Sequence, residues 1–229
     1  MADDILVAQD IGLKVRESSN ILLLAPSPHP SDLNICTDIL AIRPEEQFNI
    51  WSLGITLSAD DRITHWHDRV GRTPSEFKVV TTGDPRIPPA GDHGHDHGAA
   101  GALDPEVVTL SDPGNLTKIG VELTNSLTEW GANDHKTMVC IHSITALMQY
   151  VEVKSVFKFL HEIKNEVDRA NGVAHYHMDP YAHDEATIGK VKQIFDTVIR
   201  IDLEENWHVT NREFEVTGDG AIPTLDALD

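Results

Sequence analysis

The sequence is poor in basic residues. Among its 229 residues, 18 are Lys or Arg and 37 are Asp or Glu, which gives a formal net charge of −19. A surface of this sign repels a phosphate backbone, so we expect no nucleic-acid partner bound through a broad basic face. The acidic residues are spread over the whole chain, which favours a protein adapted to a cytosol of molar salt, where the Debye length is about 3 Å. An acidic protein of an ordinary cytosol is the alternative.

Cysteine and long apolar runs are also scarce. Cys36 and Cys140 are the two cysteines, and both stand in apolar surroundings. Two isolated cysteines build neither a disulfide framework nor a thiolate metal site, so we expect buried thiols in a reducing compartment. No run approaches the ~20 apolar residues that span a bilayer, and the acidic start Met-Ala-Asp-Asp does not resemble a secretory signal. We therefore expect a cytoplasmic protein without membrane insertion.

Short apolar runs that alternate with amphipathic segments are abundant. Residues 21–25 read Ile-Leu-Leu-Leu-Ala, which is typical of a strand buried in a parallel sheet. The alternation predicts an α/β fold with a mostly parallel central sheet, helices on both faces and an antiparallel hairpin at one edge. The other predicted strands are 48–53, 77–81, 107–110, 138–141, 173–178, 197–201, 207–210 and 212–216. Helices are predicted at 33–42, 60–69, 116–130, 153–171 and 185–195.

The predicted domain organisation is simple. A chain of this length can bury one sizeable core, so residues 1–218 are expected to form one domain. Residues 83–103 are rich in Gly, Pro, Asp and His and lack apolar periodicity, which predicts a flexible loop. Residues 219–229 are expected to form an acidic, solvated tail.

The segment after the first predicted strand reads Ala25-Pro-Ser-Pro-His-Pro-Ser-Asp. Ligands of open parallel sheets bind beyond the carboxyl ends of the strands, where a phosphate loop has Gly-x-x-x-x-Gly-Lys-Ser/Thr. On that template Ala25 and Pro30 replace the glycines, Ser31 replaces the lysine, and Asp32 replaces the residue that binds Mg²⁺. Proline lacks the N–H that would contact phosphate. The segment therefore lacks the donors and the cation of a working phosphate loop.

Two later segments suggest a family. The stretch Thr137-Met-Val-Cys-Ile-His-Ser-Ile-Thr-Ala-Leu-Met is similar to the Walker B segment of KaiC-type ATPases, with His142 where those proteins have an aspartate. The stretch Gly172-Val-Ala-His-Tyr-His-Met-Asp-Pro, continued to residue 201, is similar to the late strand, loop and helix of haloarchaeal KaiC-like proteins. The chain resembles that family, many members of which lack a usable phosphate loop. The resemblance implies a three-layer RecA/KaiC-like P-loop NTPase fold.

The resemblance also implies a nucleotide position that has lost its catalytic parts. The catalytic carboxylate of that family would follow the second predicted strand, residues 48–53. No glutamate follows this strand closely here, and Asp60 and Asp61 lie several residues further on. Hydrolysis in this family needs positioned metal and phosphate contacts, so no catalytic residue is carried over and no ATPase activity is expected. The vestigial nucleotide site would comprise Ala25, Pro30, Ser31, Asp32 and His142.

The expected function is therefore recognition. We expect a non-catalytic regulatory protein that acts by protein–protein interaction, for example in signal transduction, and that has no cofactor. A nucleotide-binding switch with little or no hydrolysis is one alternative, and a metal-binding protein is another. RecA-like rings share nucleotide between subunits, so without nucleotide we expect a monomer or homodimer rather than a hexamer.

Histidine supports the metal alternative. His93, His95 and His97 alternate with Gly and Asp, a pattern that can bind Zn²⁺ or Ni²⁺. A flexible polar insert that binds metal only adventitiously is the other interpretation of these residues.

A second group comprises His142, His175, His177 and Asp179, and His183 and Asp184 follow in the adjoining loop. If strands 138–141 and 173–178 are neighbours, their carboxyl ends meet, and His175 and His177 point to the same side of the sheet. These residues then form either a metal or anion site or a hydrogen-bonded polar cluster. In the second case the cluster holds residues 179–185 and caps the next helix.

Overall fold

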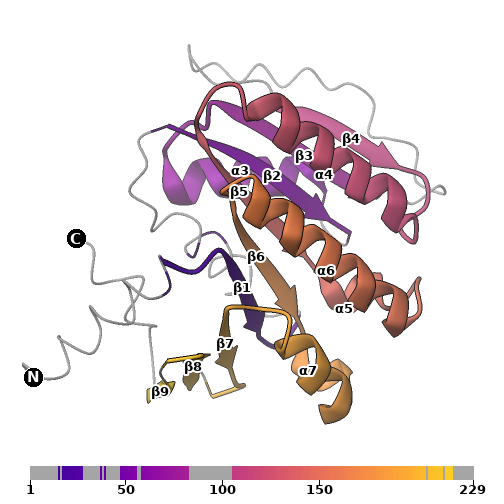
Figure 1. Ribbon diagram of the computed structural model, residues 1–229, viewed down its shortest axis with the longest axis vertical. Helices are drawn as coiled ribbons and strands as arrows, with labels where there is room; N and C mark the ends of the chain where they lie inside the picture. Colours follow the sequence, from indigo (N-terminus) through magenta and orange to yellow (C-terminus); the bar gives the residue numbers. More distant parts are fainter. Residues whose placement is uncertain are drawn as a thin grey trace, which may run out of the picture.

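The computed structural model describes residues 15, 17–27, 37, 39, 47–55, 58–82, 105–204, 206–213 and 215–218. Within these ranges the chain forms one nine-stranded sheet with the order β4-β3-β2-β5-β6-β1-β7-β8-β9 (Figure 1). The strands are β1 (Asn20–Leu24), β2 (Phe48–Gly54), β3 (Glu76–Thr82), β4 (Glu106–Leu110), β5 (Lys136–His142), β6 (Val173–Met178), β7 (Thr197–Ile201), β8 (Trp207–Asn211) and β9 (Glu215–Gly218).

Strand direction agrees with the predicted α/β class. The seven strands from β4 to β7 pair in parallel, and β8 and β9 continue the sheet antiparallel. The first strand lies between β6 and β7, and all five of its residues are buried. Continuous apolar runs suit this place, because helices or loops cover both faces of a parallel sheet.

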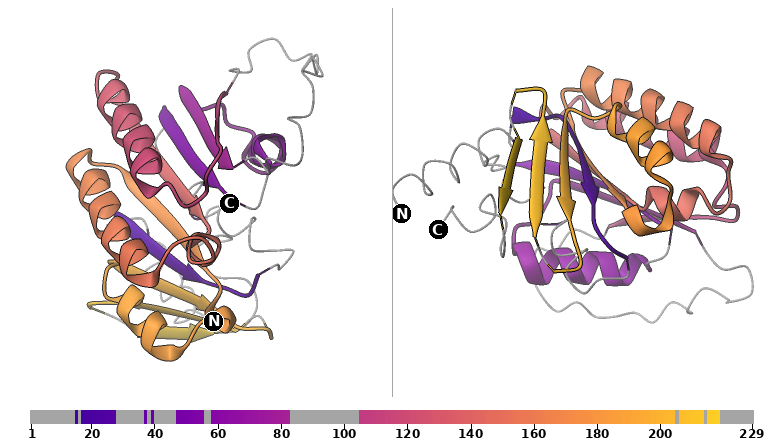
Figure 2. Two further views of the ribbon diagram at one scale, coloured as in Figure 1. Left: turned by 90° about the vertical axis from the view of Figure 1, so that its right-hand side faces the viewer. Right: turned by 90° about the horizontal axis from the view of Figure 1, so that it is seen from below.

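Helices lie on both faces of the sheet (Figure 2). On one face lie α4 (Leu116–Trp130), α5 (Ile144–Leu147), α6 (Val153–Arg169) and α7 (Glu185–Lys192), and the largest apolar cluster fills the space beneath them. On the other face α3 (Ala59–Val70) packs on β2, β3 and β5 through Trp66. A third cluster joins β1, β7 and β8 to Val15 and Ile39 on that same face.

Helix ends follow local capping chemistry. Asn115 caps α4, and its side chain accepts a hydrogen bond from Lys118 N at 3.0 Å. The predicted start of α3 at Asp60 or Asp61 is wrong by one or two residues, because Ser58 is the cap and accepts from Asp61 N at 3.1 Å. Both aspartates instead lie in the first turn, where they complement the helix dipole.

Several other boundaries differ from the expectation by one to three residues. The last helix, α7, ends at Lys192 rather than at residue 195, and β9 lies at Glu215–Gly218 rather than at 212–216. The short helix α5 was not predicted, because four residues are too few to carry a periodic pattern. The predicted loop 83–103, the tail 219–229 and most of the predicted helix 33–42 lie outside the described residues.

Candidate functional site

The carboxyl edge of the parallel strands brings two of the predicted histidines together. Ile141 of β5 pairs with Tyr176 of β6, so the next residue of each strand, His142 and His177, is also adjacent. Their rings stack with centroids 4.5 Å apart and an interplanar angle of 6°. His142 is 3% exposed and His177 is 0% exposed. The predicted meeting of these strand ends is confirmed, and its product is a buried, stacked pair of imidazoles.

His175 lies deeper on the same side of the sheet and belongs to a different set of contacts. Its Nδ1 lies 3.7 Å from Cys140 Sγ on the neighbouring strand. Arg62 of α3 donates from Nη2 to the same sulfur at 3.0 Å and from Nε to Ser52 Oγ at 2.7 Å. Cys140 is buried as predicted, but its surroundings include a guanidinium and an imidazole and are therefore not purely apolar.

The chain that leaves β1 is hydrogen-bonded to the end of β6. Ala25 donates its backbone N–H to the carbonyl of Met178 at 3.2 Å. Ser27 donates its backbone N–H to Asp179 Oδ2 at 3.3 Å. Pro26 between them has no N–H to offer. The remaining predicted nucleotide-site residues of this segment, Pro30, Ser31 and Asp32, lie outside the described residues.

Asp179 and Thr145 connect three loops at this edge. Asp179 donates its backbone N–H to Thr145 Oγ1 at 2.9 Å, and its Oδ1 accepts from Tyr181 N at 2.8 Å. Thr145, in α5, also lies 3.0 Å from His183 Nε2. Asp184 then caps α7 by accepting from Thr187 N at 2.7 Å. Thr145, Asp179, His183 and Asp184 therefore form a hydrogen-bonded polar cluster that holds residues 179–185 and caps α7, as one of the two predicted alternatives describes.

Two groups of this cluster have shifted pKa values. Burial lowers the pKa of His183, and the nearby carboxylates of Asp179 and Asp184 oppose this shift without cancelling it. Hydrogen bonds from Thr187 lower the pKa of Asp184. At neutral pH the cluster thus combines a neutral imidazole with an ionised helix cap.

The structure describes some of the predicted metal ligands and not others. In the described part of the chain, no group of three or more His, Cys, Asp or Glu side chains is arranged to hold a metal ion. His142 and His177 stack, and His175 contacts Cys140, so these three do not converge on one point. His93, His95 and His97 lie outside the described residues, and their metal binding stays a prediction.

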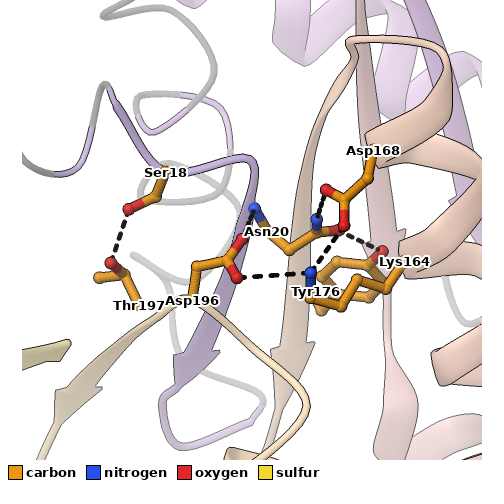
Figure 3. Close-up of polar contacts among 7 residues, drawn as sticks. All are labelled: Ser18, Asn20, Lys164, Asp168, Tyr176, Asp196 and Thr197. Atoms are coloured by element: carbon orange, nitrogen blue, oxygen red, sulfur yellow. Dashed lines mark hydrogen bonds and ion pairs between the residues drawn. The ribbon is translucent and has the colours of Figure 1, made fainter. Parts of the chain in front are cut away.

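A second polar network lies at the opposite, amino end of β1 (Figure 3). Asn20 accepts from Tyr176 Oη at 3.0 Å and donates to Asp168 Oδ1 at 2.8 Å. Lys164 Nζ lies 2.7 Å from Asp168 Oδ2 and 3.4 Å from Asp196 Oδ1. This network joins β1 and β6 to α6 and to the segment before β7.

Sequence reasoning missed Arg62 and Thr145, whereas it placed Asp179 next to the histidines at the end of strand 173–178. The signal for Arg62 was its spacing of four from Trp66, which places both on one helix face; both are buried. Thr145 and Asp179 each come three residues or fewer after a buried strand, where side chains of parallel strands meet.

Comparison with solved structures places this arrangement in a known fold. The flagellar accessory protein FlaH from Methanocaldococcus jannaschii is similar with a TM-score of 0.52 and 10% identity, over 92% of this chain and 90% of that one. The uncharacterized protein PH0321 from Pyrococcus horikoshii is similar with a TM-score of 0.54 and 11% identity, over 91% of each chain. The KaiC-like protein PH0186 from the same organism reaches a TM-score of only 0.46 at 10% identity, over 88% of this chain and 82% of that one.

These similarities and the strand order agree with a RecA/KaiC-like fold. No curated protein matches the chain significantly. No helix in the described ranges is long and apolar enough to cross a membrane. A family model covers residues 18–201, from two residues before β1 to the end of β7. The chain belongs to this family, which is described as a family of unknown function, DUF7504.

Proposed function

We propose that this RecA/KaiC-like protein is a non-catalytic regulator that acts by binding another protein in a salt-adapted archaeal cytoplasm. The observation that carries the proposal is the buried His142–His177 stack at the carboxyl ends of β5 and β6. The sequence resemblance puts the Walker B aspartate of KaiC-type ATPases at the position of His142. Mg²⁺ prefers oxygen ligands, and an imidazole buried against another imidazole does not replace a carboxylate.

The other described residues of the position also do not fit Mg²⁺ with a nucleotide. Ser27 donates its N–H to the Asp179 carboxylate, which occupies a donor and leaves a negative charge next to the loop. A phosphate placed there would face that charge without the lysine of a phosphate loop. Beyond β2, Asp61 is bonded to Ser58 in the capping of α3, with Ser58 Oγ to Asp61 Oδ2 at 2.6 Å.

Two observations support protein binding over other modes of recognition. The net charge of −19 disfavours nucleic acid as a partner. PH0321, which has a similar fold, was crystallised in complex with an unknown peptide. In the proposed account, protein side chains take the place of nucleotide at the strand ends of the RecA-like sheet. The surface at these strand ends is then available to a protein partner.

Phosphate release in molar KCl tests the non-catalytic part. We expect no release from ATP and Mg²⁺ above that of a sample whose protein has been removed by filtration. Release that stays proportional to this protein through successive columns would contradict the proposal. Affinity capture from a native lysate tests the second part, and a bait that consistently returns without a partner would count against it.

A further inference from the structure

Exposed apolar side chains gather at the carboxyl edge of the sheet. In the described ranges six large apolar residues are exposed, and four of them, Tyr150, Val153, Tyr181 and Leu203, follow β5, β6 or β7. The other two, Val107 and Val121, lie in β4 and α4. Scattered single apolar residues are normal on a surface, but a concentration on one edge is typical of an interaction site.

Each of the three loops holds its apolar residue by local hydrogen bonds. Tyr150 donates its N–H to the carbonyl of Leu147 at 3.0 Å, directly after α5. Tyr181 donates its N–H to Asp179 Oδ1 at 2.8 Å. Leu203 lies in the β7–β8 turn that Asp202 closes by accepting from Asn206 N at 2.9 Å. Side chains presented by fixed turns lose little conformational entropy when they bind, which favours affinity.

The sheet sets the spacing of this row. The loops follow β5, β6 and β7, and the order β5-β6-β1-β7 puts three strand intervals between the first and the last. At about 4.8 Å per interval the ends of β5 and β7 are about 14 Å apart. Tyr150 lies further out, because it follows α5 and its backbone lies next to Gly114 in the loop after β4. Thr145 bonds to Asp179 and to His183, so the loops after β5 and β6 form one connected platform. A helix that contacts all three loops must therefore be longer than this interval, and an α-helix of about 18 residues is about 27 Å long.

Acidic residues flank the exposed apolar ones. Glu152 precedes Val153, Asp184 and Glu185 follow Tyr181, and Glu204 follows Leu203, and all four acids are exposed. The basic residues in the same segments are Lys154 and Arg200, and Arg200 lies 4.0 Å from Glu185. The edge therefore combines apolar anchors with an acidic rim.

Resting on the proposed protein-binding function, we propose that this carboxyl edge binds a basic amphipathic helix of a partner protein. Tyr150, Tyr181 and Leu203 are the apolar anchors, and the acidic rim pairs with Lys or Arg of the partner. Tyrosine is enriched among residues that dominate binding energy. A second copy of this chain is disfavoured as the occupant, because it would bring another −19 of charge.

A pair of designed peptides tests the proposal. The probe is a fluorescent amphipathic helix of about 18 residues, about 27 Å long, made of leucine and lysine, and its match replaces every lysine by glutamate. Fluorescence anisotropy in molar KCl measures binding to the full chain. We expect the lysine peptide to bind and the glutamate peptide to bind at least about tenfold more weakly, because contact ion pairs lie within the Debye length even there.

Matched variants locate the binding surface. We expect Tyr150→Ser and Tyr181→Ser each to weaken binding of the lysine peptide by about tenfold, and Leu203→Ser to weaken it less. Val107→Ser and Val121→Ser, which remove exposed apolar side chains elsewhere, are expected to leave it unchanged. Circular dichroism checks that each variant is folded.

Three outcomes would overturn this inference. They are equal binding of the two peptides, an equal loss in Val121→Ser, and no binding of the lysine peptide to the wild-type chain. A dimer in sedimentation that Tyr181→Ser dissociates would assign the edge to a second copy instead. Partner capture and phosphate release with a Tyr150→Ser/Tyr181→Ser/Leu203→Ser variant separate the two proposals. If this variant still captures the partner, the carboxyl edge is not the binding surface, but the proposed protein-binding function stands.

Discussion

His142 and His177 form a buried stack at the ends of β5 and β6, and the proposed loss of nucleotide chemistry rests on this pair. The resemblance to KaiC-type ATPases puts a carboxylate at the position of His142, where two flat imidazoles stack instead. Because both are almost fully buried, they also fill the interior at the ends of β5 and β6. Their substitution should therefore be felt in stability.

His177→Ala is expected to lower the free energy of unfolding by about 2–4 kcal/mol, because it leaves a cavity and removes the stacking partner of His142. The matched control is His67→Ala, whose side chain is 71% exposed, with an expected change within about 0.5 kcal/mol. Guanidinium unfolding in molar KCl measures both. Equal effects of the two substitutions would show that the stack contributes nothing.

The network of Asn20, Lys164 and Tyr176 (Figure 3) contains two groups whose pKa values are raised in the fold. Burial lowers the pKa of Lys164, but its hydrogen bond to Asp168 and the charge of Asp196 outweigh burial, and the net pKa is raised. Burial, with the charges of Asp168 and Asp196, raises the pKa of Tyr176 well above its ordinary value. Both groups therefore favour their protonated forms in the fold.

The free energy of unfolding is expected to fall as pH rises above about 10, through the raised pKa values, because the unfolded chain loses these protons first. Tyr176→Phe should reduce this dependence while it keeps the ring packed. Chemical unfolding from neutral to alkaline pH measures it. A wild-type curve that stays flat, or one that Tyr176→Phe leaves unaltered, would be the contrary result.

At the scale of elements, α5 and the loop after β6 are joined by Thr145. Its hydroxyl accepts from Asp179 N and contacts His183 Nε2, and burial keeps that imidazole neutral by lowering its pKa. A lowered pKa means that the unfolded chain takes up a proton before the folded one does. The junction should therefore weaken in acid.

The contribution of His183 to stability is expected to be present above about pH 6.5 and to be lost as pH falls through its lower folded pKa. His183→Gln should remove that part of the pH dependence, and Thr145→Val should lower stability by about 1–2 kcal/mol at neutral pH. Thermal unfolding at a series of pH values tests both. An unchanged pH profile in His183→Gln would refute the assignment.

Sequence periodicity predicted the elements well where they are long and apolar. The strand 173–178 and the helix 116–130 have the predicted bounds, because all six residues of the strand are buried and the helix buries one face. Periodicity failed for α5, because this helix is a single turn capped by Ser143 and is too short to show a repeat. It also could not foresee Arg62 next to Cys140, because contacts between α3 and β5 depend on how the layers pack.

At the scale of the whole molecule, the charge of −19 is the dominant feature. It gives strong self-repulsion at low salt, and screening removes most of it when the Debye length shortens. The expectation of salt adaptation rests on this property and on the even spread of the acidic residues.

The melting temperature is expected to rise by several degrees between about 0.1 M and 2 M KCl, because shorter screening relieves repulsion in the compact state. Differential scanning calorimetry at fixed pH measures the change, with equimolar potassium glutamate as a second salt. A melting temperature that falls or stays level across this range would contradict salt adaptation.

Thermal unfolding with and without ATP and Mg²⁺ in molar KCl tests the central claim most directly. A ligand at about 100 times its Kd adds about 2.7 kcal/mol to the native state, which for a chain of this size raises the melting temperature by about 5–10 °C. The proposed function, in which His142 replaces the Walker B aspartate, predicts no rise. A rise that saturates with ATP concentration would contradict the claim and identify the protein as a nucleotide-binding switch.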